Sequence, residues 1–255
     1  MLQVKAILKK FVFQINNKNL DFKKITIPLF GKITNNHTSC DKQCNTAITN
    51  QPKVNNNNIV TIHCIRHAES TINALRNHNI KTLNINELLS GKDPGILDAP
   101  LSKNGVENAN YFGDEGGPTY KGKPIMERAS LIITSNLRRA METSNLISKR
   151  SSENCKICVL DFVREKALYV SDVPCLSKQE IIKNYPKADI SFLPDADYKN
   201  LIILPEDHDQ VDQRIQQFIN FVKNYQDLEN NEIVLVSHYY FLKRLLKGMF
   251  LKICI

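Results

Sequence analysis

Short runs of β-branched and apolar residues alternate with helical patterns through most of this 255-residue chain. A buried strand of a parallel sheet typically appears in a sequence as such a run, bounded by polar residues. Strands that alternate with helices form βαβ units, whose helices cover both faces of a mostly parallel sheet. We therefore predict an α/β fold, a three-layer αβα sandwich with a mostly parallel central sheet. The predicted strands are 59–65, 131–134, 158–162 and 232–236, and the predicted helices are 137–149, 177–184, 211–225 and 239–249.

The first 58 residues differ in composition from the rest of the chain. They are rich in Asn, show no sustained apolar periodicity, and hold nine Lys against two Asp. We therefore predict an Asn- and Lys-rich disordered tail over residues 1–58 and one domain over residues 59–255. The tail would carry +7 of the net charge of +8, which leaves the domain nearly neutral. A nucleic-acid partner, which a charge of +8 at first suggests, is therefore not expected.

The sequence also indicates where the protein resides. No apolar run approaches the roughly 18 residues that a membrane-spanning helix requires, so we expect no integral membrane segment. Lys9 and Lys10 interrupt the opening apolar stretch before it reaches signal-peptide length. The seven Cys are odd in number and scattered, which favours reduced thiols. We expect a cytoplasmic protein, with organellar targeting as the less favoured alternative.

Three of the predicted strands lead directly into basic residues. The first runs into Arg66 and His67, the second is followed by Arg138 and Arg139, and the last is followed by His238. Ligand sites of such sheets form at the carboxyl ends of the strands. If these strands are neighbours, the side chains converge on one positive pocket, which suits a doubly or triply charged oxyanion.

These segments resemble motifs of the histidine phosphatase superfamily, in its phosphoglycerate mutase-like branch. Each motif alone is weak, but four in the family's order over residues 59–250 are specific. They imply the phosphoglycerate mutase-like form of the three-layer fold. The four are Arg66-His67-Ala68-Glu69-Ser70 with Asn73, similar to R-H-G/A-E-x-x-x-N; Asp98 to Gly105, similar to D-x-x-L-T-x-x-G; Ser135 to Thr143, similar to S-P-L-x-R-A-x-x-T; and Val236 to Leu242, similar to V-S-H-x-x-F-L.

The resemblance implies a covalent mechanism. His67 would attack the phosphorus atom and carry the phosphoryl group as a phosphohistidine, since a neutral imidazole is a good nucleophile near pH 7. Glu165 would be the general acid that protonates the leaving oxygen, because it falls where the family places its acid. Asp172, in the following loop, is the alternative for this acid.

The resemblance also implies which groups bind the phosphate. Arg66, Arg139 and His238 would stabilise the three equatorial oxygens during transfer, and Asn73 would add a neutral donor. Arg138, the other Arg of the adjacent pair, is expected on the helix surface. We expect no metal and no other cofactor, because guanidinium groups would supply the positive charge.

The predicted function is therefore a metal-independent phosphatase that hydrolyses phosphomonoesters of a small molecule or a phosphoprotein. A phosphoglycerate mutase-type phosphotransferase ranks lower, because Lys166-Ala167-Leu168 stands where the mutase-type residues would follow the acid. A catalytically weak phosphate-binding module is the third alternative. Substrate specificity would come from residues 74–97 and 166–210, whose sequence does not indicate which substrate is bound. The sequence gives no indication of oligomeric state.

Two departures from the family pattern lie near the end of the chain. Tyr239 and Tyr240 follow His238 where small residues are common, so we expect a narrower or more aromatic pocket mouth. The chain ends at Ile255, soon after the last predicted helix, whereas relatives usually continue into another strand and helix. We therefore expect a domain truncated at its C-terminus.

Overall fold

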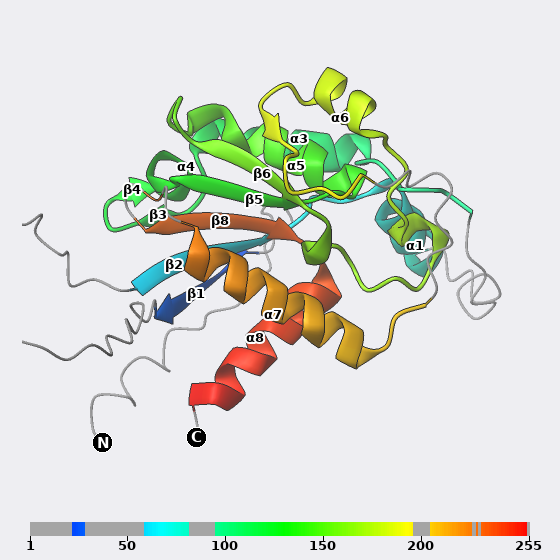
Figure 1. The fold of residues 1–255 in the computed structure, drawn as a ribbon. Helices are drawn as coiled ribbons and strands as arrows, with labels where there is room; N and C mark the ends of the chain where they lie inside the picture. Colours follow the sequence, from blue (N-terminus) through cyan, green and yellow to red (C-terminus); the bar gives the residue numbers. More distant parts are fainter. Residues whose placement is uncertain are drawn as a thin grey trace, which may run out of the picture.

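A six-stranded sheet forms the middle layer of the fold (Figure 1). The computed structural model describes residues 22–28, 59–81, 95–195, 205–225, 228 and 231–253. Neighbouring strands pair in parallel, except that β1 is antiparallel to β2. In sheet order the strands are β1 (Phe22–Pro28), β2 (Ile59–Arg66), β8 (Glu232–Ser237), β5 (Leu131–Ser135), β6 (Lys156–Leu160) and β7 (Ala188–Asp189). A separate small hairpin consists of β3 (Thr119–Tyr120) and β4 (Lys123–Pro124).

Helices cover both faces of this sheet. One face carries α7 (His208–Asn224) and α8 (Tyr239–Ile253), and the other carries α3 (Lys103–Glu115), α4 (Ile125–Arg128) and α5 (Arg138–Ile147) (Figure 1). Two further helices, α1 (Thr71–Lys81) and α6 (Lys178–Asn184), complete the described helices. The predicted three-layer αβα fold with a mostly parallel sheet is confirmed. Within the described ranges, no helix combines the length and the apolar character needed to cross a bilayer.

Alternate residues of the central strands face opposite helical layers. Ile133 and Leu235 are buried in one cluster with Phe218 of α7, whereas Ile132 and Val234 are buried in a second cluster on the other side. Burying such a side chain contributes about 1.5–3 kcal/mol. Every residue of β5 and β8 is buried, which explains why both strands appear in the sequence as unbroken apolar runs.

All predicted strands and helices are present, although their ends differ from the prediction. β6 begins at Lys156 and ends at Leu160, because residues 161–163 form a 3₁₀ turn. α7 begins at His208, three residues before the predicted start, because Asp207 caps the helix by accepting a hydrogen bond from the Gln210 backbone N–H. The sequence prediction did not include α1 or α3. The sequence feature that could have indicated α3 is its N-cap, Ser102, whose side chain accepts a hydrogen bond from the Gly105 backbone N–H.

Residues 22–28 correct the prediction of a disordered tail over residues 1–58. They form β1, which pairs antiparallel with β2 from Phe22 opposite Ile65 to Pro28 opposite Ile59. The segment Phe-Lys-Lys-Ile-Thr-Ile-Pro has the β-branched and aromatic content of a strand, and its terminal Pro is tolerated at a sheet edge. The prediction failed because this run is short and stands between Asn-rich segments. The remainder of the predicted tail lies outside the described residues.

Candidate active site

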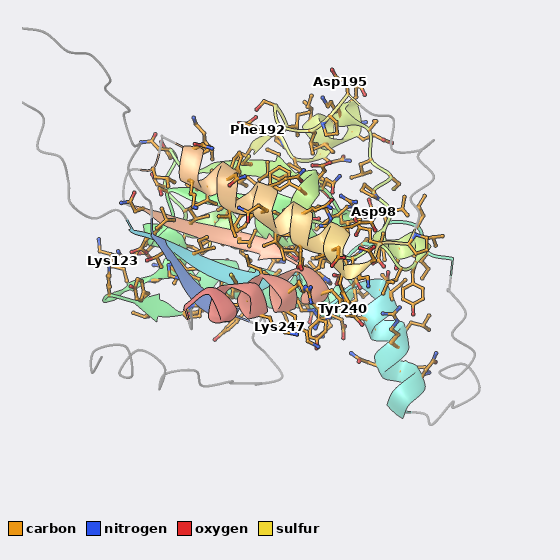
Figure 2. The ribbon with its side chains drawn as sticks, turned by 60° about the horizontal axis from the view of Figure 1, so that its bottom comes forward. Asp98, Lys123, Phe192, Asp195, Tyr240 and Lys247 are labelled. Carbon is orange, nitrogen blue, oxygen red and sulfur yellow. The ribbon has the colours of Figure 1, made fainter. Side chains whose placement is uncertain are left out.

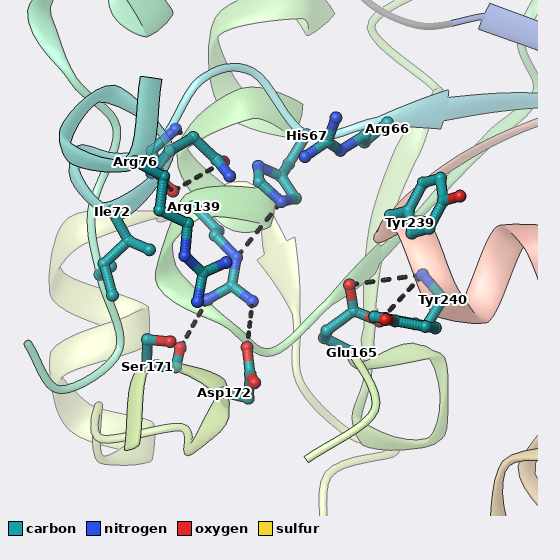
Figure 3. A pocket seen from close by; sticks show the side chains of 13 residues that line it. Arg66, His67, Ile72, Arg76, Arg139, Glu165, Ser171, Asp172, Tyr239 and Tyr240 are labelled. Carbon is teal, nitrogen blue, oxygen red and sulfur yellow. Dashed lines mark hydrogen bonds and ion pairs between the residues drawn. The ribbon is translucent and has the colours of Figure 1, made fainter. Parts of the chain in front are cut away.

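A polar cavity of about 180 Å³ lies where three neighbouring strands end (Figure 3). Its lining includes residues that end or directly follow β2, and residues that begin α5 and α8 after β5 and β8. Because β2, β8 and β5 are adjacent in the sheet, the convergence expected from the sequence occurs for Arg66, His67 and Arg139. Of the catalytic and phosphate-binding residues predicted from the sequence, His238 does not line this cavity, and those that do are Arg66, His67, Asn73, Arg139, Glu165 and Asp172.

His67 follows the last residue of β2 and is buried, with 7% of its surface exposed. Its Nδ1 lies 2.7 Å from the Ala68 carbonyl oxygen. Since a carbonyl can only accept a hydrogen bond, the proton of the neutral ring is on Nδ1 and the lone pair is on Nε2. Burial, assisted by the Arg139 and Arg66 charges, holds the pKa of His67 well below its usual value. The imidazole is therefore neutral at physiological pH.

Gly105 allows α3 to approach the backbone next to His67. A β-carbon at this position would lie 2.0 Å from the Glu69 carbonyl oxygen, so only glycine fits. The Ser102 backbone N–H donates to this carbonyl at 2.9 Å, and the Ser102 hydroxyl donates to the Glu69 side chain at 2.7 Å. Glu69 therefore fixes the loop after β2 to the start of α3, and it is not among the residues that line the cavity.

His238 lies directly behind His67 and follows the last residue of β8. The two ring centroids are 4.9 Å apart, and His238 is fully buried. Burial and the nearby Arg139 charge hold its pKa well below the usual value. Among the described residues, neither of its ring nitrogens has a hydrogen-bond partner. A buried polar group in this state is costly. His238 itself does not line the cavity, and it adjoins the site through its contact with the His67 ring.

Arg139 lies on the first turn of α5 and is held by three hydrogen bonds (Figure 3). Its Nε donates to Nε2 of His67 at 3.3 Å, and its Nη1 donates to the Ser171 carbonyl oxygen at 2.6 Å. Its Nη2 donates to the Asp172 carboxylate at 3.0 Å. The guanidinium is therefore fixed against the nucleophilic nitrogen of His67.

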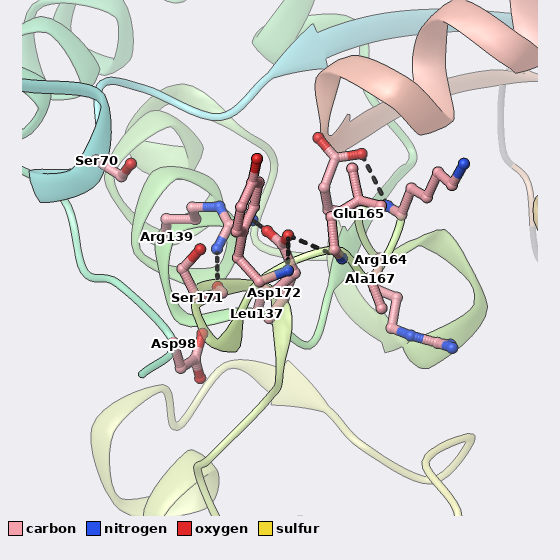
Figure 4. A network of polar contacts seen from close by, with 12 residues as sticks. Ser70, Asp98, Leu137, Arg139, Arg164, Glu165, Ala167, Ser171 and Asp172 are labelled. Atoms are coloured by element: carbon pink, nitrogen blue, oxygen red, sulfur yellow. Dashed lines mark hydrogen bonds and ion pairs between the residues drawn. The ribbon is translucent and has the colours of Figure 1, made fainter. Parts of the chain in front are cut away.

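Asp172 lies between Arg139 and Glu165 (Figure 4). Its second carboxylate oxygen accepts from the backbone N–H groups of Leu168 at 3.3 Å and Tyr169 at 3.2 Å. Burial raises the pKa of Asp172, although the Arg139 charge and these N–H groups oppose the shift. Both oxygens of this carboxylate are thus occupied by donors.

Arg138 points away from the cavity, as expected from the sequence. Its side chain is partly exposed, and its Nε donates to Glu142, one turn further along α5, at 2.8 Å. Its backbone N–H donates to the buried Asp98 at 2.8 Å, and a second Asp98 oxygen accepts from the Cys175 backbone N–H at 3.1 Å. Burial raises the pKa of Asp98 to about 6. Asp98 therefore joins the start of α5 to the loop that contains Cys175.

Glu165 faces His67 from the opposite side of the cavity (Figure 3). It is 9% exposed, and its Oε1 accepts from the backbone N–H groups of Lys166 at 2.9 Å and Tyr240 at 3.1 Å. Burial raises its pKa, and the Asp172 charge adds to the shift, although the N–H groups and Arg139 oppose it. Glu165 therefore keeps its proton to a higher pH than an exposed carboxyl group does.

A buried ion-pair network, which the sequence analysis missed, holds the backbone around Glu165. Arg214 of α7 donates to the carbonyl oxygens of Phe162 at 3.0 Å and Arg164 at 2.9 Å. Glu206 accepts from Arg214 at 2.7 Å, from Arg164 at 2.6 Å and from the Ala167 backbone N–H at 3.0 Å. Burial opposes ionisation of Glu206, but these donors outweigh it and lower its pKa. The sequence feature that could have indicated this network is Arg214, a charged residue on the otherwise apolar, buried face of α7.

Other lining residues form the mouth of the cavity. Tyr239 and Tyr240 are 47% and 41% exposed, which agrees with the aromatic mouth expected from the sequence. Arg76 of α1 also lines the cavity, and its guanidinium carbon lies 5.1 Å from the Tyr169 ring centroid. Asn73 uses its Oδ1 to accept from the Ser70 hydroxyl at 2.8 Å. The sequence analysis did not single out Arg76, which falls in the range 74–97 from which it expected substrate specificity to come.

The family model of the histidine phosphatase superfamily (branch 1) matches residues 62–252. No curated protein matches the chain. Among solved structures, the chain is similar to ecdysone phosphate phosphatase from Bombix mori, with 15% identity, a TM-score of 0.46, and coverage of 73% of this chain and 76% of that chain. It is also similar to a mycobacterial glucosyl-3-phosphoglycerate phosphatase, with 18% identity, a TM-score of 0.40, and coverage of 72% and 78% respectively. For phosphoserine phosphatase from Entamoeba histolytica the values are 18% identity, a TM-score of 0.40, and coverage of 74% and 79%. These likenesses are too distant to carry an argument about substrate.

Proposed function

Because the chain belongs to the histidine phosphatase superfamily (branch 1), we propose that it hydrolyses phosphomonoesters through a phosphohistidine on His67. The matched range contains all four motifs, so the family resemblance is confirmed. One observation carries the proposal: His67 is a neutral imidazole whose proton is directed to the Ala68 carbonyl and whose Nε2 lone pair accepts a hydrogen bond from Arg139. This is the tautomer that a nucleophilic histidine requires.

In the first step, the Nε2 lone pair of His67 forms a bond to phosphorus as the bond between phosphorus and the ester oxygen breaks. Glu165 gives its proton to that oxygen, and the alcohol leaves. Its raised pKa supports this role, since the acid must be protonated beforehand. Arg66, Arg139 and His238 stabilise the charge on the phosphoryl oxygens, and Asn73 contributes a further donor.

In the second step, a water molecule attacks the phosphorus atom of the phosphohistidine. The Glu165 carboxylate takes a proton from the water as the new bond between oxygen and phosphorus forms. The bond between Nε2 and phosphorus breaks, its electron pair returns to His67, and inorganic phosphate leaves. Glu165 is then protonated again for the next cycle.

We assign the acid role to Glu165 rather than Asp172 because of their contacts. Asp172 binds Arg139 through one oxygen and two backbone N–H groups through the other, so it orients the guanidinium. Within the described residues, Glu165 accepts hydrogen bonds only from backbone N–H groups and forms no ion pair, and it lines the cavity. We also propose that no metal is required, since two guanidinium groups supply positive charge to the phosphate.

The test is hydrolysis of p-nitrophenyl phosphate without added metal, comparing the wild type with His67→Ala and with His78→Ala, an exposed histidine on α1. We expect His67→Ala to lower kcat by at least about a thousandfold, while His78→Ala and a chelator leave it unchanged. Mass spectrometry of the wild type quenched at alkaline pH should detect one acid-labile phosphoryl group on His67. Turnover that survives in His67→Ala, or that disappears with the chelator, would contradict the proposal.

A further inference from the structure

A second cavity, of about 270 Å³, lies between α7 and α8 next to the candidate active site. We call it the basic cavity, because Lys166, Lys243, Arg244, Lys247 and His208 are five of its seven lining residues. The other two, Val211 and Tyr240, add apolar surface. Most of the surface that the cavity exposes is apolar, although five of its seven lining side chains are basic.

One face of α8 supplies most of this lining. Tyr240, Lys243, Arg244 and Lys247 follow the spacing of three and four residues that brings side chains onto one helix face. Figure 2 shows Tyr240 and Lys247 along the same side of this helix. Lys166 comes from the loop that carries Glu165, and His208 comes from the first turn of α7.

The charge of the basic cavity is only partly compensated. Arg244 donates two hydrogen bonds to Asp212 of α7, at 2.6 and 2.5 Å. The negative charge of Asp209 also helps to raise the pKa of Arg244. In the described ranges, the side chains of Lys166 and Lys247 make no hydrogen bond or ion pair, and Lys243 contacts the Tyr239 ring. The charges of Lys247 and His208 nevertheless help to lower the pKa of Asp212. Several like charges around one hollow repel one another, and an anion would relieve that repulsion.

The basic cavity adjoins the candidate active site directly. Tyr240 lines both cavities, and its backbone N–H binds Glu165. Tyr239 also connects them, since its ring centroid lies 5.9 Å from the Arg66 guanidinium carbon and 5.4 Å from the Lys243 ammonium. The two cavities therefore share a wall at Tyr240, and Lys243 lies close to both through its contact with the Tyr239 ring.

We propose that the basic cavity binds a second phosphate group of a small-molecule bisphosphate whose first phosphate is hydrolysed at His67. This inference rests on the proposed function, which it extends to a substrate class. A small molecule fits better than a peptide segment, because the lysines surround a hollow of limited volume and Val211 with the Tyr240 ring can pack against a short carbon linker. The lysines would act as point charges that tolerate several orientations of the phosphate.

Turnover gives the first test. The wild type is compared on 1,6-hexanediol bisphosphate and on hexyl phosphate, which share the linker and differ in the second phosphate. At low salt we expect kcat/KM to be about tenfold or more higher for the bisphosphate, chiefly through KM, and the advantage should shrink as salt is added. Lys243→Met/Lys247→Met should reduce this advantage to less than about threefold. The matched control is Lys183→Met/Lys223→Met, which removes the same charge from exposed positions on α6 and α7 and should retain the advantage.

Binding gives a second test that does not depend on turnover. Calorimetry with hexane-1,6-bisphosphonate and with hexylphosphonate should give a Kd about tenfold lower for the bisphosphonate in the wild type, and nearly equal values in Lys243→Met/Lys247→Met. Equal affinities and equal kcat/KM values in a wild type that hydrolyses p-nitrophenyl phosphate would overturn the bisphosphate proposal and leave the proposed function intact. Preferential binding of the bisphosphonate without any turnover of the phosphate esters would instead contradict the proposed function, and it would support a phosphate-binding role for the basic cavity. Preference for an acidic phosphopeptide over both small molecules would also overturn the proposal.

Discussion

The two sides of the candidate active site are held in place differently. On the phosphate side, His67 directly follows β2 and is oriented by the carbonyl of the next residue, and Arg139 lies on the first turn of α5, shortly after β5. On the acid side, Glu165 lies on a loop whose backbone forms hydrogen bonds with two later side chains. Arg214 donates to its carbonyl groups and Glu206 accepts from one of its N–H groups, about 40 to 50 residues further along the chain. A sheet positions the groups at its strand ends through its own geometry. A loop requires additional contacts to reach comparable precision.

The two sides also differ in electrostatics. The phosphate side places fixed cations next to two neutral imidazoles, so an anionic phosphate is favoured there. The acid side raises the pKa of a carboxyl group by burial. If this division is correct, substitutions on the two sides should have distinguishable kinetic signatures.

With His67 in place, the largest effect that does not depend on the leaving group should come from Arg139→Lys on the phosphate side. Lysine keeps the positive charge but cannot form the three bonds to His67, Ser171 and Asp172. We expect kcat to fall by about 10²–10³. The factor should be similar for aryl and alkyl phosphates, because the phosphoryl charge is the same in both. Steady-state kinetics should find Arg138→Lys, on the exposed side of the same helix, close to the wild type; equal losses in the two variants would refute the assignment.

An effect that depends on the leaving group is expected for Glu165→Gln. An alkoxide leaves poorly without a proton, so kcat for hexyl phosphate should fall by about 10²–10⁴, whereas nitrophenolate leaves readily and its rate should change much less. Wild-type kcat on the alkyl ester should fall as pH rises through the raised pKa of Glu165, because the protonated form is the active one. This decline should be absent in Glu165→Gln.

Two controls accompany the Glu165 measurement. Glu153→Gln removes an exposed carboxylate and should leave the pH profile unchanged. An equal loss on the aryl and alkyl esters in Glu165→Gln would place the acid elsewhere, and Asp172→Asn would then be the next variant to examine by the same pH profile.

The smallest catalytic effect should come from Glu206→Gln, which acts through the loop alone. The amide keeps an acceptor for the Ala167 N–H but leaves the charges of Arg164 and Arg214 uncompensated. We expect kcat to fall about tenfold with KM little changed, and the pH at which kcat declines should shift. Urea unfolding should detect a loss of about 3–5 kcal/mol.

Glu206→Asp should restore part of the kinetic loss of Glu206→Gln, since it restores the charge. As a matched control, Asp195→Asn removes the carboxylate of an exposed pair with Lys178 and should cause no measurable change. A stability loss in Glu206→Gln with an unchanged pH profile would indicate a purely structural role.

The phosphate side could be predicted from the sequence, and the support of the acid side could not. Arg66, His67, Arg139 and His238 follow apolar runs, and the rule that parallel strands end at one edge brings them together. Glu165 was located only through the family resemblance. Its support by Glu206 and Arg214 depends on how α7 packs against a loop, and no local periodicity encodes that contact. β1 was missed because its pairing with β2 is likewise non-local.

The position of β1 has a consequence for how the protein behaves at high concentration. β1 lies at one end of the described sheet and occupies the backbone hydrogen-bonding edge of β2, whose eight residues form an apolar, β-branched run. An uncovered strand of this kind templates pairing with other chains and leads to aggregation. β1 itself carries Lys23, Lys24 and Pro28, features that discourage further pairing at a sheet edge. The strand that the sequence analysis assigned to a tail thus helps to protect the protein from self-association into insoluble material.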